Sequence, residues 1–454
     1  MSSFVRRHKF TKSPLTPLCQ RGIKQLPLSK RGIEGDFKNI IYNIFILMNF
    51  LIPIIIPGMV WGADVHGLIS VEDYFSKDSS SAYDFNILTT RTRLDATKLN
   101  TAGTLGFHFD GRERNVLASK DYNSSYIKSE RIDTLNIEYT GLSKGVYLSV
   151  GRQLPKELSL ERLDGLNLVY SNDTTGGGVF GGLKPDPYTD QFGSGYSTAG
   201  AYLFHRTNDL YANLALVHNG YKGETDRQYI SGSSYYYPSK EINLYGSIMG
   251  DINQDSGNTD LTNALLEASY RPGNGSISVG YTEFQSIRYY KSMPIDYTYA
   301  RSSQHSYYLR GDYRLGDRYT LYGRFDRQTQ ISSGLVSEEK IRDVYHIGFR
   351  NDNLLNSNIS FDISDETAGG YGYSYNNYRL DMRRLFGETF ELGLNGSLQQ
   401  SRYDYYDGTE TIMTYGASGD IRLAKRWHVS LSYEGMQASA YSTNTAISRV
   451  TYRF

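Results

Sequence analysis

Charged residues recur at every second position in the second half of this 454-residue sequence, and their spacing decides what chemistry they offer. In an extended strand, residues two apart point to the same face. The charged positions are Arg310, Asp312, Arg314, Arg324, Asp326, His346, Arg350, Arg379, Asp381, Arg383, Arg449 and Arg453. The opposite parity is mostly apolar. Charges of both signs on facing strands predict a hydrated pore that orders water and favours small polar solutes. The alternative is that these charges only neutralise one another across a filled lumen.

Residue patterns for catalysis or metal binding are weak. The seven histidines after residue 63 are scattered, and no serine stands in a nucleophile-elbow motif. The acidic loop 251–262 has some calcium-loop ligands, but Gly257 comes one place late and Thr262 replaces the final glutamate. A solvated loop is the favoured interpretation. The glycine run 176–182 lacks the helix and lysine of a phosphate loop. We therefore expect no enzyme activity, metal or cofactor.

Composition indicates what kind of fold carries these residues. The chain has 45 Gly, 41 Tyr and 11 Pro, and its mean hydropathy is −0.49. No stretch after residue 62 reaches the roughly 20 apolar residues of a spanning helix, whereas polar lumen-facing residues dilute the hydropathy of a transmembrane barrel. Residues 64–454 carry 39 basic and 46 acidic residues, which argues against a nucleic-acid partner. The only cysteine, Cys19, precedes them.

The strands are predicted from alternating segments separated by turn residues. Clear examples are 276–281, 319–326, 390–395 and 428–434. Short connections (100–103, 142–144, 272–275, 316–317, 386–388, 424–425) alternate with long ones (75–84, 114–129, 183–195, 285–303, 329–338, 402–409). The pattern predicts an all-β, membrane-spanning, antiparallel up-and-down barrel with short periplasmic turns, long extracellular loops and both termini in the periplasm. We count 22 strands; 174–182 is the weakest, so 20 or 18 stay open.

A closed barrel would pair every backbone group within lipid. Five tyrosines then fall at strand ends, where aromatic girdles lie: Tyr74, Tyr170, Tyr270, Tyr313 and Tyr403. Trp427, just past a short turn, suits the periplasmic girdle. Simple β-propensity is the alternative explanation for some of these tyrosines. A constriction would have to come from infolded loops, for which 285–303 and 183–195 are the longest candidates.

The last stretch, 443–454, alternates an apolar face with a polar, cationic one. Its apolar parity includes Val450, Tyr452 and Phe454. This resembles the C-terminal signature of bacterial outer-membrane β-barrels, which the β-barrel assembly machinery reads. The resemblance implies that Phe454 and Tyr452 are the assembly signal. The last strand of a soluble sandwich is the alternative.

The first 63 residues are expected to be absent from the mature barrel. An apolar block from about residue 40 follows basic residues and precedes Gly62 and Ala63, which predicts a signal peptide over 48–63. Residues 1–47 contain a short imperfect repeat and are interpreted as a spurious or disordered extension. A retained membrane helix is the alternative, but Pro53 and Pro57 interrupt it. The barrel is expected to occupy 64–454.

One internal stretch adds a further resemblance. Gly151-Arg152-Gln153, followed by 162–170 with its Asp-Gly pair, is similar to a strand pair of Gram-negative porins and alginate-export-type barrels. It departs from those families in lacking a tryptophan between the motifs. The resemblance implies that Arg152 is a lumen or constriction arginine, although strict alternation puts it on the lipid face with Val150. We expect a break in register at Gly151, because glycine often marks a bulge; an interfacial Arg152 reaching to water is the alternative.

These observations predict a bacterial outer-membrane, porin-like channel for small hydrophilic solutes, in contact with lipid and lipopolysaccharide. The alternative function is a structural barrel or sheath for an export or electron-transfer partner. Stable single-channel openings would favour the channel, whereas co-purifying haem or lipoprotein without openings would favour the sheath. A homo-oligomer and the identity of the solute are left open.

Overall fold

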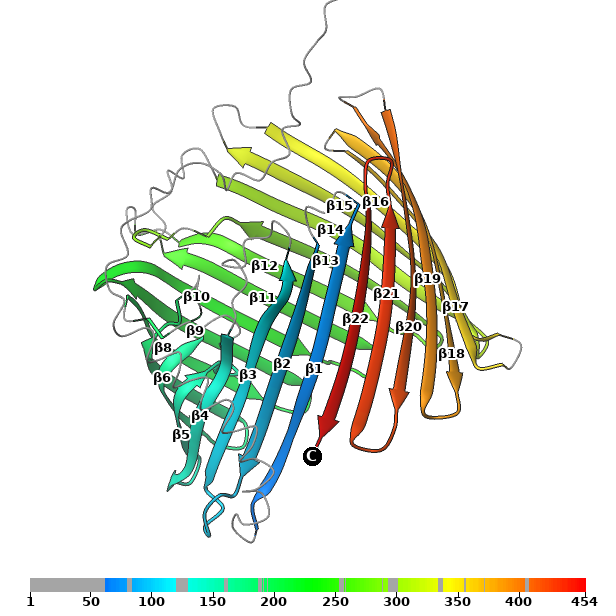
Figure 1. Cartoon of the computed structure of the whole chain (residues 1–454). Helices are drawn as coiled ribbons and strands as arrows, with labels where there is room; N and C mark the ends of the chain where they lie inside the picture. The colour runs from blue at the N-terminus through cyan, green and yellow to red at the C-terminus, as the bar shows by residue number, and fades with distance from the viewer. Residues whose placement is uncertain are drawn as a thin grey trace, which may run out of the picture. The chain divides into compact units, whose positions relative to one another are not determined.

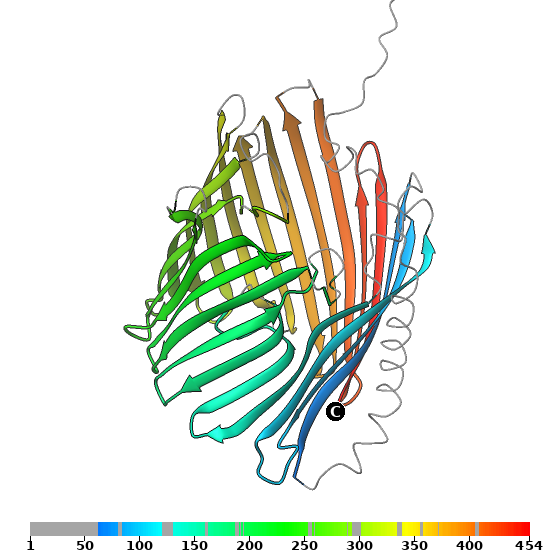
Figure 2. The ribbon, with the colours of Figure 1, turned by 90° about the vertical axis from the view of Figure 1, so that its left-hand side faces the viewer.

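A computed structural model describes residues 62–454 except 80–83, 120–129, 159–161, 187–189, 191, 194, 253–256, 258, 288, 293–300, 334–337, 355–356, 371 and 405–407. Within these residues the protein is a single β-sheet (Figures 1 and 2). None of the described residues forms a helix long and apolar enough to cross a membrane. The expected extension and most of the expected signal peptide lie outside the described residues and stay predictions.

Within the described residues the chain forms twenty-two strands. They are β1 (Asp64–Asp78), β2 (Phe85–Thr97), β3 (Leu105–Ser119), β4 (Glu130–Ser143), β5 (Val146–Gln153), β6 (Leu163–Ser171), β7 (Thr175–Leu183), β8 (Tyr196–Arg206), β9 (Leu210–Tyr221), β10 (Glu224–Tyr236), β11 (Ile242–Ile252), β12 (Thr259–Tyr270), β13 (Gly275–Gln285), β14 (Arg301–Leu315), β15 (Tyr319–Ser333), β16 (Glu338–Leu354), β17 (Ile359–Gly370), β18 (Tyr373–Phe386), β19 (Phe390–Tyr403), β20 (Gly408–Arg422), β21 (Trp427–Gln437) and β22 (Ser442–Arg453). The weak segment 174–182 corresponds to β7, so the predicted count of 22 is confirmed.

The sheet closes on itself. Each strand pairs antiparallel with the next, as β1 does with β2 and β21 with β22. The last strand then pairs with the first, from Leu68 opposite Arg453 to Asp78 opposite Thr443. Closure leaves no unpaired strand edge, which a sheet surrounded by lipid requires. The predicted up-and-down barrel is therefore confirmed.

The two ends of the barrel differ in their connections. We call the end where β1 begins the turn end, and the opposite end the loop end. Connections at the turn end have two to seven residues, whereas those at the loop end reach fifteen, in 286–300. All six predicted turns lie at the turn end and all six predicted loops at the loop end. Two loop-end connections, 222–223 and 371–372, are as short as hairpin turns.

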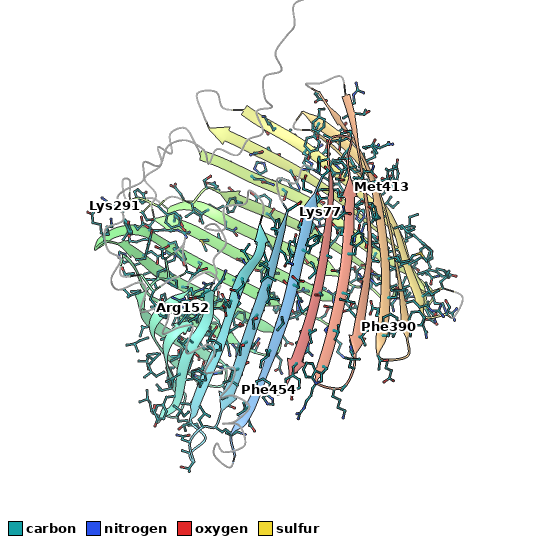
Figure 3. The ribbon with its side chains drawn as sticks, viewed as in Figure 1. Lys77, Arg152, Lys291, Phe390, Met413 and Phe454 are labelled. Atoms are coloured by element: carbon teal, nitrogen blue, oxygen red, sulfur yellow. The ribbon has the colours of Figure 1, made fainter. Side chains whose placement is uncertain are left out.

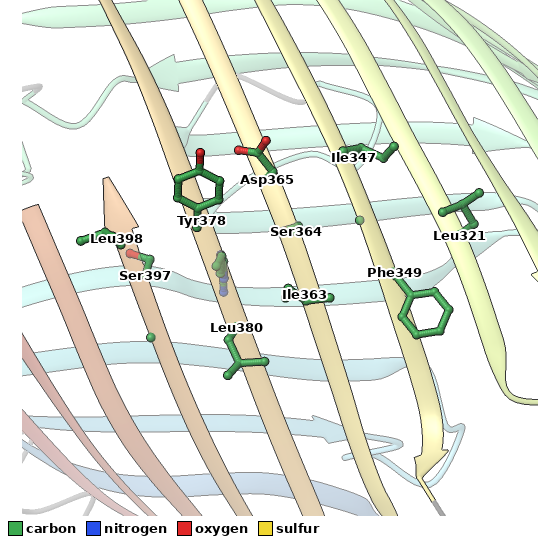
Figure 4. A pocket seen from close by; sticks show the side chains of 13 residues that line it. Leu321, Ile347, Phe349, Ile363, Ser364, Asp365, Tyr378, Leu380, Ser397 and Leu398 are labelled. Atoms are coloured by element: carbon green, nitrogen blue, oxygen red, sulfur yellow. The ribbon is translucent and has the colours of Figure 1, made fainter. Parts of the chain in front are cut away.

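The outer face is apolar. Leu321, Phe349 and Leu380 lie on the near side of their strands in Figure 4, with the opposite barrel wall behind them. Trp427 and Tyr452 are on the same face, with ring centres 4.7 Å apart. Tyr170, Tyr270 and Tyr313 are likewise exposed on the outward parity.

Two of the predicted girdle tyrosines have the opposite parity. Tyr74 alternates with the outward Val71 and Phe75 and stacks on Phe85 with ring centres 5.5 Å apart. Tyr403 donates a hydrogen bond to Glu410 at 3.2 Å and lies on the inward parity of β19. The prediction that Tyr74 and Tyr403 belong to an aromatic girdle was wrong. A position near a strand end does not decide which face of the sheet the side chain takes.

Tyrosines on the inner face lie flat across glycines of the neighbouring strand. Tyr322 of β15 crosses Gly348 of β16 and donates a hydrogen bond to Asp362 of β17 at 2.5 Å. A Cβ on Gly348 would lie only 2.2 Å from the Tyr322 ring. Tyr308 crosses Gly280 in the same way and bonds to Glu267. The rings therefore lie along the wall instead of projecting into the lumen.

Candidate functional site

The lumen has a packed wall, formed by β5–β11. Many inward side chains there are almost completely buried: Val217 is 0 % exposed, and Tyr202 and Tyr229 are each 2 % exposed. Outward neighbours on the same strands, such as Leu214 and Leu216, are more than half exposed. The inner cluster consists of Leu158, Leu163, Val169, Phe180, Tyr202, Ala215, Val217, Tyr229 and Met249. A hydrophobic core thus fills one side of the barrel interior.

Leu158 belongs to no strand, and it shows what covers this wall. It lies in the connection after β5, whose first part, 154–158, therefore packs on the inner wall. The Glu157 backbone oxygen accepts a hydrogen bond from the Asn213 side chain of β9 at 3.3 Å. The Glu157 carboxylate is also 3.9 Å from Arg206 of β8. No periodicity in 154–162 would have identified this segment from the sequence.

Arg152 is 2 % exposed and holds a second loop-end connection in place. Its guanidinium pairs twice with Asp164 of β6, with both nitrogen–oxygen distances 2.6 Å. It donates further bonds to the backbone oxygens of Ile132 at 3.1 Å and Asp190 at 2.8 Å. The Phe192 ring centre is 4.2 Å away. The residue therefore ties 184–195 to three strand ends.

The expected break in register at Gly151 was wrong. Pairing continues through this point, with Asn136 opposite Gly151 and Leu135 opposite Arg152. Gly151 instead has φ of +121°, and a Cβ there would lie 2.2 Å from the Leu135 oxygen. Only glycine tolerates this backbone readily. Arg152 therefore keeps the parity of the outward Val150, and its guanidinium is buried in an ion pair at the loop end. A lumen role for Arg152 stays a prediction.

The connection after β13 is attached to the same side of the barrel (Figure 3). Asp226 of β10 accepts hydrogen bonds from the backbone nitrogens of Lys291 at 2.7 Å and Ser292 at 2.9 Å. Beside it, Arg227 is 3 % exposed and bonds to Asp251 of β11 at 2.7 Å. Both predicted infolding candidates thus contact buried acids or arginines. Asp251 binds a guanidinium here, and most of the acidic loop after it lies outside the described residues.

The opposite wall, β14–β18 with β22, β1 and β2, displays charge. Arg324 is 50 % exposed at its side chain, whereas its partner Asp326, 2.5 Å away, is 8 % exposed. Arg379 and Asp381 show the same asymmetry at 2.6 Å. The further pairs are Arg310–Glu267, Arg350–Asp352, Arg449–Glu72, Arg91–Asp110 and Arg93–Asp95. The Arg350 and Asp352 side chains are about equally exposed, whereas in every other pair the carboxylate is clearly the less exposed partner. The guanidiniums therefore face the lumen.

Several predicted residues gather around one polar cavity of about 470 Å³ on the inner face of β15–β18. They are His346, Arg350, Arg379, Asp381 and Arg383. Arg310, Arg324 and His346 stand in one cross-strand row beside it. Asp312 accepts a hydrogen bond from Ser276, while Arg314 is exposed further toward the turn end. Arg449 lies apart on β22, and Arg152 is outside this group.

Sequence reasoning missed the acids that hold these arginines and tyrosines. Glu267, Asp362 and Glu366 accept hydrogen bonds from Tyr308, Tyr322 and Tyr375 respectively. The alternation of Ser360, Asp362 and Ser364 with Ile359, Phe361 and Ile363 carried the necessary signal, and Glu366 continues the polar parity. Arg91, Arg93 and Asp95 alternate in the same way on β2. The terminal Phe454 ring lies over Gly67 of β1, and its role as an assembly signal stays a prediction.

The sequence matches no protein-family model and no curated protein. Among solved structures, the siderophore receptor PirA from Pseudomonas aeruginosa is similar with a TM-score of 0.51 and 12% identity, covering 86% of this chain and 80% of that one. OccK2 from the same organism is similar with a TM-score of 0.44 and 9% identity, covering 87% of this chain and 98% of that one. A BenF-like porin from Pseudomonas fluorescens is similar with a TM-score of 0.43 and 9% identity, covering 86% of this chain and 98% of that one. Together with the closed 22-stranded sheet, the similarity to PirA shows that this chain has the fold of the large outer-membrane β-barrels.

Proposed function

We propose that this protein is an outer-membrane channel that passes small hydrophilic solutes along the charged wall of its lumen. The observation that carries the proposal is the row of half-exposed guanidiniums around the cavity on β15–β18. Barrels of this strand number are wide enough for an aqueous path unless the lumen is plugged. The turn end would face the periplasm and the loop end the exterior, with lipid and lipopolysaccharide against the apolar outer face.

The arrangement of each ion pair supports a preference for anionic solutes. The acids lie against the wall and the guanidiniums reach into the lumen, although each pair is neutral as a whole. A solute in the lumen therefore meets positive hydrogen-bond donors first. Rings of charged side chains set the selectivity of pores in this way.

Planar-bilayer recording tests this function. Purified, folded protein should give stable single-channel openings, and its reversal potential in a potassium chloride gradient should indicate anion preference. Folding is checked in the same sample by heat-modifiable gel mobility. Folded protein that gives no openings would overturn the proposal.

A sheath around an export or electron-transfer partner is less compatible with the interior. Such a partner would have to pass through the lumen, but the inner hydrophobic core, with Leu158 inserted into it, occupies one wall. Haem or lipoprotein co-purifying with a non-conducting barrel would support the sheath instead. We likewise propose no catalytic role: His108 contacts Asp95 and Glu138, and His346 packs on Tyr322.

A further inference from the structure

Three arginines form a cross-strand row on the inner wall of β2–β4. Arg91 lies directly opposite Arg112, and Arg112 lies opposite Arg131. All three share the inward face, because Arg91 bonds to Asp110, which has the parity of Arg112. Like charges directly opposite one another destabilise a sheet. A row of this kind therefore needs negative charge to compensate it.

The available carboxylates compensate only the two outer arginines. Arg91 pairs with Asp110 through nitrogen–oxygen distances of 2.9 and 2.6 Å. Arg131 pairs with Asp133 at 2.5 Å. Among the residues that the structure describes, no acid forms an ion pair or hydrogen bond with Arg112. The charges of Arg91, Arg131 and Arg114 all act on it, and the charge of Asp133 opposes them.

A carboxylate from a loop already occupies the edge of this cluster. Asp190, in the connection 184–195, lies 3.7 Å from Arg131 and 3.1 Å from Arg162. Arg162 also reaches Asp133 at 3.4 Å. The cluster thus binds a carboxyl group brought from outside the wall. The half-buried Arg112, whose guanidinium has a planar fork of donors, has no carboxylate partner of this kind among the described residues.

We propose that Arg112, with Arg91 and Arg131 on either side, is a binding site for a small oxyanion: a carboxylate, phosphate or sulfate group. Guanidinium nitrogens bind such groups through two parallel hydrogen bonds. The site rests on the proposed function only for access, since a solute would reach it through the lumen. Bound anion would neutralise the central charge of the row and stabilise the barrel.

Thermal unfolding of the purified barrel tests the site without any current measurement. Sulfate, phosphate and succinate are titrated separately at constant ionic strength, with chloride as reference, because exposed charges are screened by salt. At least one oxyanion should raise the melting temperature of the native protein. Arg112→Gln should weaken its apparent affinity about tenfold, the loss expected for a charge-assisted hydrogen bond, and Arg112→Lys should retain part of it.

The matched control is Arg327→Gln. Arg327 pairs with Asp343 at 2.8 Å on the outward parity, so this variant should bind oxyanions like the native protein. Arg112→Gln should fold at least as well as the native chain without oxyanion, because it removes a repelling charge. An Arg112→Gln protein that binds oxyanions normally would overturn the site, as would a native protein that binds none. Conductance without oxyanion binding would refute the binding site and leave the proposed channel function standing. Oxyanion binding without conductance would refute only the proposed channel function.

Discussion

At the scale of single residues, glycine and tyrosine work as pairs in this barrel. Gly348 and Gly280 leave room for Tyr322 and Tyr308 to lie against the wall and reach acids two strands away. Gly67 leaves room for the Phe454 ring in the same way at the seam between β22 and β1. These contacts explain why so much glycine is compatible with strands, where it otherwise weakens pairing.

We expect Gly67→Val to prevent closure of the barrel. Its Cβ would lie 2.4 Å from Phe454 Cζ and 2.5 Å from the Arg93 backbone oxygen, and the backbone atom cannot move aside without opening the sheet. Phe454→Ala should lower folding yield as well, because it removes the ring from the seam. Heat-modifiable gel mobility measures both. Gly396→Ala is the control, since its nearest neighbour would be 3.6 Å away; equal yields in all three variants would show that the seam contact is unimportant.

Arg152 and Asp164 should behave as a buried ion pair. Arg152→Leu leaves the Asp164 carboxylate without its partner and should destabilise the barrel by about 3–5 kcal/mol, the usual cost of breaking a buried pair. The double variant Arg152→Leu/Asp164→Leu should recover much of this loss. Denaturant unfolding of the native protein, Arg152→Leu, Asp164→Leu and the double variant gives the coupling energy. Additive effects of the two substitutions would contradict the assigned pairing.

At the scale of elements, the stretch 154–158 is anchored on the inner wall because Leu158 is inserted into the inner core. We expect Leu158→Ala to destabilise the protein by about 2–5 kcal/mol. It should also raise single-channel conductance, since the segment loses its anchor. Leu154→Ala is the matched control, because Leu154 is exposed. Unchanged conductance in Leu158→Ala would mean that this segment lies off the conduction path.

The strands were predictable and the infolded segments were not, for a physical reason. Alternation is a local property, so residues such as 319–326 reveal a strand and its two faces from the sequence alone. On β6, however, Leu166 and Leu168 face outward while Leu163 and Val169 face the inner core. Apolar residues on both parities indicate that something covers the inner face, but not which segment does so. Leu158 and Asp190 reach their partners across several strands, and no local pattern encodes such contacts.

At the scale of the whole molecule, the barrel wall is divided into a packed side and an open side. The strands of the packed side are short, with eight or nine residues in β5–β7 against fifteen to seventeen in β14–β16. Glu157, Asp190 and Lys291, which come from three loop-end connections, all contact strands of this packed side. The open side retains exposed arginines. A solute would therefore cross the barrel next to β14–β18 and not along its axis.

This division predicts where a water-soluble thiol reagent can react. The only cysteine is Cys19, which lies within the expected extension, so a single introduced cysteine in a Cys19→Ser background is labelled uniquely. Ser360→Cys, beside the polar cavity, should react and lower conductance, because the added group enters the solute path. Two control positions should stay unreactive. Thr198→Cys lies on the packed wall, where Thr198 is 2 % exposed, and Ile363→Cys lies on the outer face, which faces lipid. Rapid labelling at Thr198→Cys would show that water reaches the inner core and that the conduction path is wider than the open side alone.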